Sequence, residues 1–267
     1  MSLPLLTSIR NPRVQQVRRL HDGRGRREAG VFVVEGTRLL EALLVADWPV
    51  REVYVVPERE GTLPAAWRDR TTVVASHVYA AMSTLEHPEG VLAVVELPVA
   101  PRMPAVRPDS LWLALDGLQD PGNVGALIRT ADAAGVEAVL LGPGCADPFQ
   151  PKVVRASMGS VFHVPMVRVP DMLACCASTR ASGMRWVATT LDDAVPLWHA
   201  ALAGPLCWWM GREGTGLPKA ALAAADIRVH IPMPGRAESL NAAAAAAVCL
   251  FETARRRRPD EVRPAGS

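Results

Sequence analysis

The second half of the chain alternates short apolar runs with helix-forming segments, and this alternation limits the possible folds more than any other feature. Apolar runs at 111–115, 136–141 and 206–210 are five or six residues long, which suits strands buried on both faces. Helical segments at 122–134 and 171–182 separate them. Such alternation is typical of a parallel β-sheet with helices on both faces. We therefore expect an α/β domain whose ligand binds beyond the carboxyl ends of the strands.

Further segments complete this half of the chain. We expect helices near 151–158 and just after Pro218, strands at 186–189 and 227–231, and an alanine-rich helix from 242 to about 255. Arginines at 255–258 suit the negative end of the last helix dipole. The remaining tail, residues 259–267, is expected to be disordered.

The first half predicts a smaller α/β domain that comprises residues 1–97. The expected elements are helices at 12–21, 37–46 and 77–82, and strands at 31–34, 52–56, 72–75 and 91–96. A proline stands at every third or fourth position from 98 to 108, which favours an extended chain. We therefore expect residues 98–110 to form a linker and residues 111–258 to form the second domain.

Composition excludes several classes of protein. A net charge of +2 is too small to indicate nucleic-acid binding by itself. The five cysteines form no C-x-x-C pair, and no histidine lies at metal-ligand spacing from them, so we expect reduced thiols and no metal site. No apolar run follows a charged start, and none reaches the roughly 18 residues of a membrane span. These features favour a soluble, cytoplasmic protein that is not associated with a membrane.

Basic residues gather near the start of the chain. Arg10 is followed by the segment 22–27, in which glycines alternate with Arg24, Arg26 and Arg27. Glycine lets a backbone approach a ligand and arginine donates to phosphate, so the segment is expected to be a flexible, basic loop that contacts a ligand bearing phosphate. A solvated surface loop with no ligand accounts for the same residues equally well.

Three loops lie at predicted strand ends of the second domain. The first, 116–125, leads into a helix that carries Arg129, and the others are 211–217 and 231–241. Glycines in the second loop have the reverse of the G-x-G-x-x-G spacing, and no Walker lysine motif is present. A phosphate cradle of the ordinary dinucleotide type is therefore poorly supported, although such glycines indicate a close approach of the backbone.

Taken together, the three loops resemble the motifs of the SpoU family of S-adenosylmethionine-dependent RNA 2′-O-ribose methyltransferases, which belongs to the SPOUT superfamily. The matching residues are Asp120-Pro-Gly-Asn-Val-Gly125 with Arg129-Thr-Ala131, Gly211-Arg-Glu-Gly-Thr-Gly-Leu217, and Ile231-Pro-Met233 with Ser239-Leu-Asn241. The resemblance covers 111–255, and residues 1–97 resemble the substrate-binding domain often attached to this family. It implies a deep trefoil knot in the parallel-sheet domain, S-adenosylmethionine as cofactor, and a homodimer with the active site at its interface.

The resemblance also implies roles for individual residues. Those implied to contact the cofactor, or to lie near it, are Gly211, Gly216, Ile231, Met233 and Leu240. Those implied in catalysis are Asn123, Arg129, Glu213, Ser239 and Asn241. Arg129 is expected to stabilise the alkoxide that emerges from the ribose, because a guanidinium with a pKa above about 12 rarely gives up a proton. It acts as a base only if a neighbouring phosphate assists.

The other catalytic residues are given less specific roles. The amides and the hydroxyl of Asn123, Ser239 and Asn241 are expected to hold the ribose and orient Arg129, and all three also suit turns and helix caps. Glu213 either orders the loops or accepts a proton, and both roles stay open.

Three questions of function stay open at the level of sequence. The substrate is expected to be 23S ribosomal RNA, by analogy with relatives that carry an added domain, with transfer RNA as the alternative. An RNA-binding protein with a catalytically silent methyltransferase domain is a second reading, which the presence of every motif residue disfavours. An ordinary nucleotide-binding enzyme is a third, which the missing glycine fingerprint disfavours.

Overall fold

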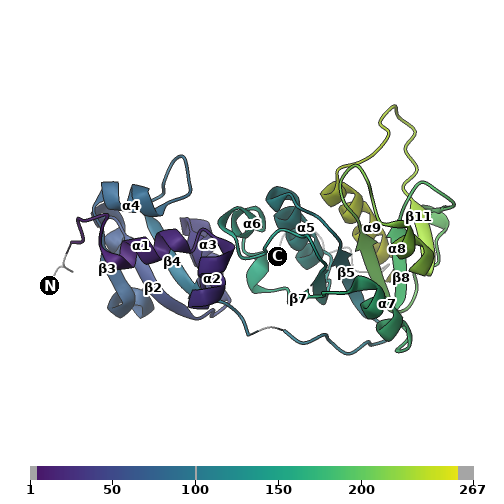
Figure 1. Ribbon diagram of the computed structural model, residues 1–267, viewed down its shortest axis with the longest axis horizontal. Helices are drawn as coiled ribbons and strands as arrows, with labels where there is room; N and C mark the ends of the chain where they lie inside the picture. Colours follow the sequence, from purple (N-terminus) through teal and green to yellow (C-terminus); the bar gives the residue numbers. More distant parts are fainter. Residues whose placement is uncertain (1–4, 100, 258–267) are drawn as a thin grey trace. The chain divides into compact units, whose positions relative to one another are not determined.

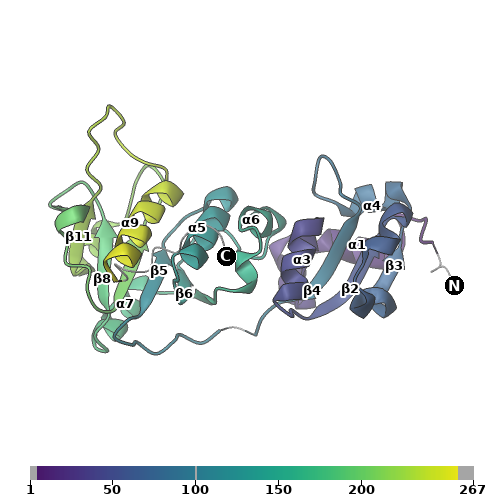
Figure 2. The same ribbon diagram turned by 180° about the vertical axis from the view of Figure 1, so that it is seen from behind.

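The computed structural model describes residues 5–99 and 101–257 (Figures 1 and 2). Contacts divide the chain into two units. The first unit comprises Met1–Val99 with Asp147–His163, and the second comprises Ala100–Ala146 with Val164–Ser267. The tail expected to be disordered lies outside the described residues. Among those described, no helix is both long and apolar enough to cross a membrane.

The second unit is built on a seven-stranded sheet in which every pair of neighbours is parallel, as the sequence predicts. Its strands are β5 (Leu111–Leu115), β6 (Ala138–Leu141), β7 (Met166–Arg168), β8 (Arg185–Thr189), β9 (Val195–Pro196), β10 (Leu206–Met210) and β11 (Ile227–His230), in the spatial order β7-β6-β5-β10-β8-β11-β9. Strands β7 and β9 were not predicted, because two or three residues are too short to show a period.

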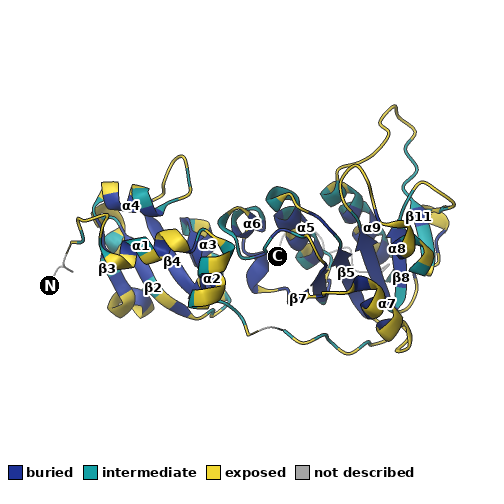
Figure 3. Cartoon of the chain, viewed as in Figure 1, coloured by how far each residue is buried: buried dark blue, intermediate teal, exposed yellow. Residues whose placement is uncertain are grey.

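Helices cover both faces of this sheet (Figures 1 and 3). They are α5 (Pro121–Ala133), α7 (Met172–Arg180), α8 (Lys219–Ala224) and α9 (Ala242–Arg257). Trp209 of β10 belongs to a core cluster with residues of α7 and α8, whereas its neighbour Trp208 donates to Thr253 of α9 at 3.1 Å. Because successive strand residues point to opposite faces, α9 lies across the sheet from α7 and α8, and α5 packs beside α9.

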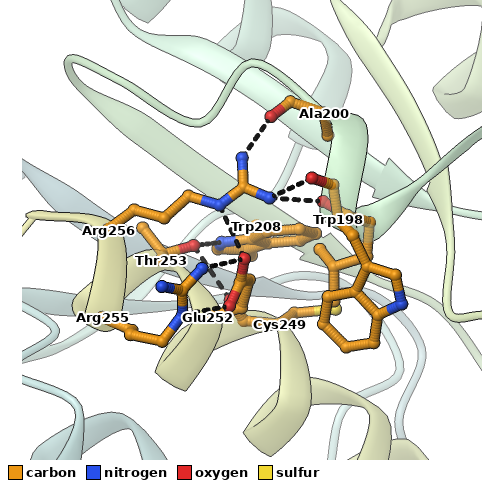
Figure 4. A network of polar contacts seen from close by, with 9 residues as sticks. Trp198, Ala200, Trp208, Cys249, Glu252, Thr253, Arg255 and Arg256 are labelled. Carbon is orange, nitrogen blue, oxygen red and sulfur yellow. Dashed lines mark hydrogen bonds and ion pairs between the residues drawn. The ribbon is translucent and has the colours of Figure 1, made fainter.

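The carboxyl-terminal part of α9 is fixed to the sheet edge by a polar network (Figure 4). Glu252, whose side chain is 9% exposed, accepts from Arg255 at 2.8 Å and from Arg256 at 2.6 Å. Arg256 also donates to the backbone carbonyls of Trp198 and Ala200 at 2.7 and 2.6 Å. The network holds in place a helix whose other end reaches the candidate site.

The first unit contains a four-stranded mixed sheet in the order β1-β4-β2-β3. Its elements are α1 (Pro12–Arg19), α2 (Gly23–Ala29), β1 (Val31–Glu35), α3 (Thr37–Val45), β2 (Val50–Val55), β3 (Thr71–Val73), α4 (Ser76–Met82) and β4 (Val91–Glu96). Strand β4 is antiparallel to both β1 and β2, and β2 is parallel to β3. The expected small α/β unit is therefore present, with one further helix.

That further helix, α2, corrects the expectation of a flexible basic loop at 22–27. Asp22 caps it by accepting from the Arg24 amide, and a Cβ on Gly25 would collide with the backbone of Arg19, so glycine permits this packing. Arg26 is only 3% exposed and binds the Asp147 carboxylate at 2.5 Å. Its guanidinium is therefore not at the surface, whereas Arg24 and Arg27 are exposed.

A segment from the second half of the sequence belongs to the first unit. Residues Asp147–His163 include α6 (Pro151–Ala156), which packs against β1. The ring of Phe149 lies 5.0 Å from that of Phe32, and the ring of Phe162 lies 5.4 Å from that of Trp48. The expected continuous domain at 111–258 is thus interrupted by a segment that completes the core of the other unit.

Candidate active site

A pocket of about 850 Å³ opens at the carboxyl ends of three neighbouring strands of the second unit. Thr189 of β8, Met210 of β10 and Val229 of β11 line it from the sheet, and the loops after β10 and β11 form its walls. Ligands of parallel α/β sheets bind beyond the carboxyl ends of their strands. The pocket is therefore at the position that the fold predicts for a ligand.

The loop after β10 closes on itself. The amides of Arg212 and Gly216 each donate to the other's carbonyl, at 3.1 and 2.9 Å. A Cβ on Gly211 would collide with the backbone of Gly216 and Leu217. Glycine at 211 is thus required by the packing of the loop itself, and not only by the approach of a ligand as the sequence indicated.

The loop after β11 forms the opposite wall. All five residues predicted to contact the cofactor or lie near it line this one pocket: Gly211, Gly216, Ile231, Met233 and Leu240. Leu240 is 39% exposed, which is high for a large apolar side chain. Apolar and backbone polar groups from two distant segments thus face a common space, while their contact with the cofactor stays a prediction.

A polar cluster joins the three loops. The Asn123 side-chain amide donates to Glu213, and that of Asn241 donates to the Asn123 oxygen at 3.0 Å and to Glu213 at 3.4 Å. Asn241 also caps α9, because its side-chain oxygen accepts from the Ala243 amide at 2.9 Å. The first turn of α5 is fixed by Asp120, which accepts from the Asn123 amide at 2.8 Å. Two helix starts therefore set the geometry of this cluster.

The two other predicted catalytic residues lie outside the cluster. Ser239 lines the pocket but makes no hydrogen bond within the described chain. Arg129 is exposed on α5 and does not line the pocket. Six helical positions separate it from Asn123, which is about 240° around the helix, so the two side chains leave different faces. Within one chain, the structure does not bring Arg129 to the cluster.

Several lining residues were missed by sequence reasoning. Thr190, Leu191 and Asp192 follow β8 and line the pocket, and the polar run after that strand was the available signal. Arg212 was also missed: its side chain lies against Gly117 and so joins the first loop to the second. Burial raises the pKa of Asp116 at the end of β5, and the nearby charge of Arg212 opposes that shift.

The chemistry of the lining limits what the pocket can hold. Its volume is within the roughly 300–1,000 Å³ of small-molecule sites. In the parts of the chain that the structure describes, no group of His, Cys, Asp and Glu could hold a metal ion. All five cysteines are free thiols. The site can thus bind an organic ligand of nucleotide size and orient a hydroxyl at the amide–carboxylate cluster.

Comparison with known families and proteins agrees with this geometry. The model of the SpoU rRNA methylase family matches residues 110–251, and that of the MRM3-like substrate-binding domain matches residues 11–93. A Bacillus subtilis protein named 23S rRNA (guanosine(2553)-2′-O)-methyltransferase RlmP is 32% identical over 92% of this chain and 97% of its own. A Streptomyces viridochromogenes 23S rRNA (uridine(2479)-2′-O)-methyltransferase is 36% identical over 93% of this chain and 91% of its own.

Solved structures share the fold over nearly the whole chain. An AdoMet-bound rRNA methyltransferase from Sinorhizobium meliloti superposes with a TM-score of 0.85 at 33% identity, covering 96% of this chain and 98% of that one. The SpoU methyltransferase AviRb from Streptomyces viridochromogenes, in complex with AdoMet, gives a TM-score of 0.82 at 35% identity, covering 93% and 98%. A family match over more than half of the chain, with relatives of this similarity along both units, establishes that the protein belongs to the SpoU rRNA methylase family.

Proposed function

We propose that this protein transfers a methyl group from S-adenosylmethionine to a ribose 2′-hydroxyl of 23S ribosomal RNA. The observation that carries the proposal is the meeting of three sequence-distant loops at the strand ends, where Asn123, Glu213 and Asn241 are hydrogen-bonded beside a pocket of about 850 Å³. Relatives named for this activity at 32% and 36% identity along both units support it.

The pocket suits the cofactor. Ile231, Leu217 and Leu240 offer apolar surface, and the backbone at Gly211 and Gly216 offers hydrogen-bonding groups, which is the mixture that a nucleoside with a sulfonium-linked amino-acid chain requires. Bound there, S-adenosylmethionine would supply an electrophilic methyl group. The residues of the chain hold it, exclude water from it and present the ribose.

The amide–carboxylate cluster suits the other reactant. Asn123 and Asn241 are held by each other and by Glu213, so their remaining hydrogen-bonding capacity is fixed in direction before a ribose arrives. Glu213 accepts from both amides, which supports its role in ordering the loops over its role in accepting a proton. Ser239 lines the same pocket and can donate its hydroxyl to the ribose.

Arg129 acts as the electrostatic stabiliser of the ribose oxygen as the proton of the 2′-hydroxyl passes to solvent. Its charge is fixed, because guanidinium stays protonated at any physiological pH. The protein forms a homodimer through the methyltransferase domain, which would bring Arg129 of a second copy to the cluster. Exposed Phe251 on α9, the helix that packs beside α5, supports an interface there.

Two further properties belong to the same proposal. The methyltransferase domain contains a trefoil knot near its carboxyl end, which is supported by β10 lying between the earlier strands β5 and β8. The protein acts in the cytoplasm, which is supported by five free cysteines in a chain of 267 residues.

The first unit docks the RNA, and ribosomal RNA is favoured over transfer RNA as the substrate. Arg10, Arg24 and Arg27 are exposed and can contact phosphates, whereas Arg26 is excluded by its burial against Asp147. Two relatives named for 23S ribosomal RNA, from Bacillus subtilis and Streptomyces viridochromogenes, match 92% and 93% of this chain and so include both units.

Mapping of 2′-O-methylated nucleotides tests the function directly. Total RNA from cells with and without the gene should differ at one position of 23S ribosomal RNA, and purified protein with S-adenosylmethionine should restore that methyl group on RNA from the deletion strain. A changed position in transfer RNA would replace the substrate assignment. No change in either RNA would overturn the proposal.

A further inference from the structure

A second pocket, of about 590 Å³, lies entirely within the first unit. Residues around the turn from β1 into α3 form one side, and Leu85 and Glu89 from the segment between α4 and β4 form another. Arg155 and Met158 complete it from the segment Asp147–His163. The pocket therefore exists only because a piece of the methyltransferase sequence folds onto the small unit.

Three arginines line this pocket, and two of them have no partner. The guanidinium groups of Arg38 and Arg59, both exposed residues, make no hydrogen bond or ion pair with any described residue. Arg155 donates to the Thr84 hydroxyl at 2.8 Å and retains further donors. Planar guanidinium groups without acid partners are suited to bidentate contacts with phosphate.

Two of the three acids in the lining are engaged in holding the walls. Glu35 is 5% exposed and accepts from the hydroxyls of Tyr79 and Ser83 at 3.0 and 2.5 Å. Glu89 accepts from the Thr37 amide at 2.9 Å and so caps the start of α3. Neither forms an ion pair with a lining arginine, so the guanidinium groups remain available to an external anion.

Met158 gives the pocket an apolar surface, and its backbone is strained. Its φ of +51° is rare for a residue with a side chain, and 44% of its surface is exposed. Left-handed geometry is unfavourable for a residue with a side chain, and the exposed part of the methionine does not offset that cost by burial. The methionine thioether makes favourable contacts with aromatic rings, including those of nucleobases.

We propose that this pocket binds one unpaired nucleotide of the substrate RNA, with Arg38 and Arg59 on the flanking phosphates and Met158 against the base. The inference rests on the proposed function for its choice of ligand. Unstacked nucleotides in loops and bulges are the usual targets of RNA recognition, and a pocket of this volume accommodates one. RNA is favoured over a protein segment because the lining offers unpaired guanidinium groups above a small apolar surface.

The first test compares two charge-matched double variants of the full chain. Arg38→Ala with Arg59→Ala changes the pocket, whereas Arg51→Ala with Arg68→Ala removes two exposed arginines of the same unit outside it. Binding to transcripts that tile 23S ribosomal RNA is measured across a salt series. The pocket variant should lose on the order of tenfold in affinity for each arginine, and its log–log salt slope should fall by about 2. Equal behaviour of the two variants overturns the proposal.

The second test separates recognition from folding. Met158→Gly relieves the left-handed strain, so the thermal midpoint should be equal to or above that of the parent. Affinity for the best-bound transcript should nevertheless fall severalfold, because the apolar contact with the base is lost. A purely structural Met158 would leave RNA affinity unchanged, and that result contradicts its assigned contact.

The two proposals fail in different ways. If the parent protein methylates 23S ribosomal RNA while the pocket variant binds RNA as the control variant does, the function stands and this site is rejected. If the pocket variant alone loses RNA affinity but the parent transfers no methyl group, the site stands and the function is rejected.

Discussion

An exposed arginine carries its charge at no desolvation cost until another molecule covers it. Arg129 is such a residue, since it is exposed on α5 and has no partner among the residues that the structure describes. Covered by RNA, its charge would act at low dielectric, where stabilisation of a developing oxyanion is large. The exposed position is therefore compatible with catalysis only in a larger complex.

Arg129→Ala should reduce methyl transfer by at least about 10²-fold, as loss of an oxyanion-stabilising donor does. The affinity for S-adenosylmethionine should stay within a few-fold, because Arg129 does not line the pocket. Single-turnover transfer and calorimetric titration measure the two quantities, with Arg68→Ala as an exposed control from the other unit. Retained turnover in Arg129→Ala would remove its assigned role.

Asn241 performs two tasks that substitution can separate. Its oxygen caps α9, and its amide nitrogen donates to Asn123. Asn241→Ala should lose about 1 kcal/mol of unfolding free energy together with methyl transfer. Asn241→Ser retains a capping oxygen, so its stability should match the parent while transfer is still lost. Chemical denaturation and a transfer assay on both variants check this split, and an active serine variant would show that the amide is dispensable.

At the scale of elements, α9 runs from the polar network around Glu252 to the site. The contribution of that network to stability depends on pH. Hydrogen bonds from Arg255 and then Arg256 lower the pKa of Glu252 to about 2. A carboxylate with a lowered native pKa stabilises the fold above its unfolded pKa of about 4.5, and that contribution is lost as pH falls toward 2. Its stabilisation is therefore complete at neutral pH.

Glu252→Gln should lower the unfolding free energy at pH 7, and the loss should shrink as pH falls from about 4.5 to 2. Denaturation curves at a series of pH values measure it. Glu86→Gln, which changes an exposed acid of the first unit, is the matched control and should give no such trend. A pH-independent loss for Glu252→Gln would mean that its packing, rather than its charge, stabilises α9.

The strands that carry the site could be predicted because each is buried on both faces and reads as a continuous apolar run, as in β5 and β10. The helix α2 could not, because its glycines indicate flexibility in isolation and only the contact of Gly25 with the backbone of Arg19 explains them. Local patterns report the period of an element. They do not report which other element it meets.

The same limit applies to the site. Loops at parallel strand ends must gather at one edge of the sheet, so the meeting of 211–217 with 231–241 followed from their positions. The bonds of Asn123 to Glu213 and Asn241 depend on side-chain directions that spacing does not give. Arg129 lies close to Asn123 in the sequence, but its side chain does not lie at the cluster of Asn123, Glu213 and Asn241.

At the scale of the whole molecule, neither unit is one continuous stretch of the sequence, because residues 147–163 belong to the first unit and interrupt the second. Phe149 and Phe162 come from the methyltransferase part of the chain but pack against Phe32, with ring centroids 5.0 and 6.5 Å apart. Removal of residues 1–97 would therefore leave two aromatic side chains without their partners. A truncation does not report RNA docking alone, because it also removes the hydrophobic core against which residues 147–163 pack.

A fragment of residues 98–267 should consequently expose apolar surface, with strong binding of a hydrophobic dye and association beyond a dimer in light scattering, although the sheet and its pocket remain. Replacing Phe149 and Phe162 with serine in that fragment should lower both signals, because exposed aromatic area is then removed. The full chain should bind no dye and associate no further than the proposed dimer. A fragment that binds no dye and stays no larger than a dimer would mean that residues 147–163 are buried elsewhere without the first unit, and that they do not depend on it for burial.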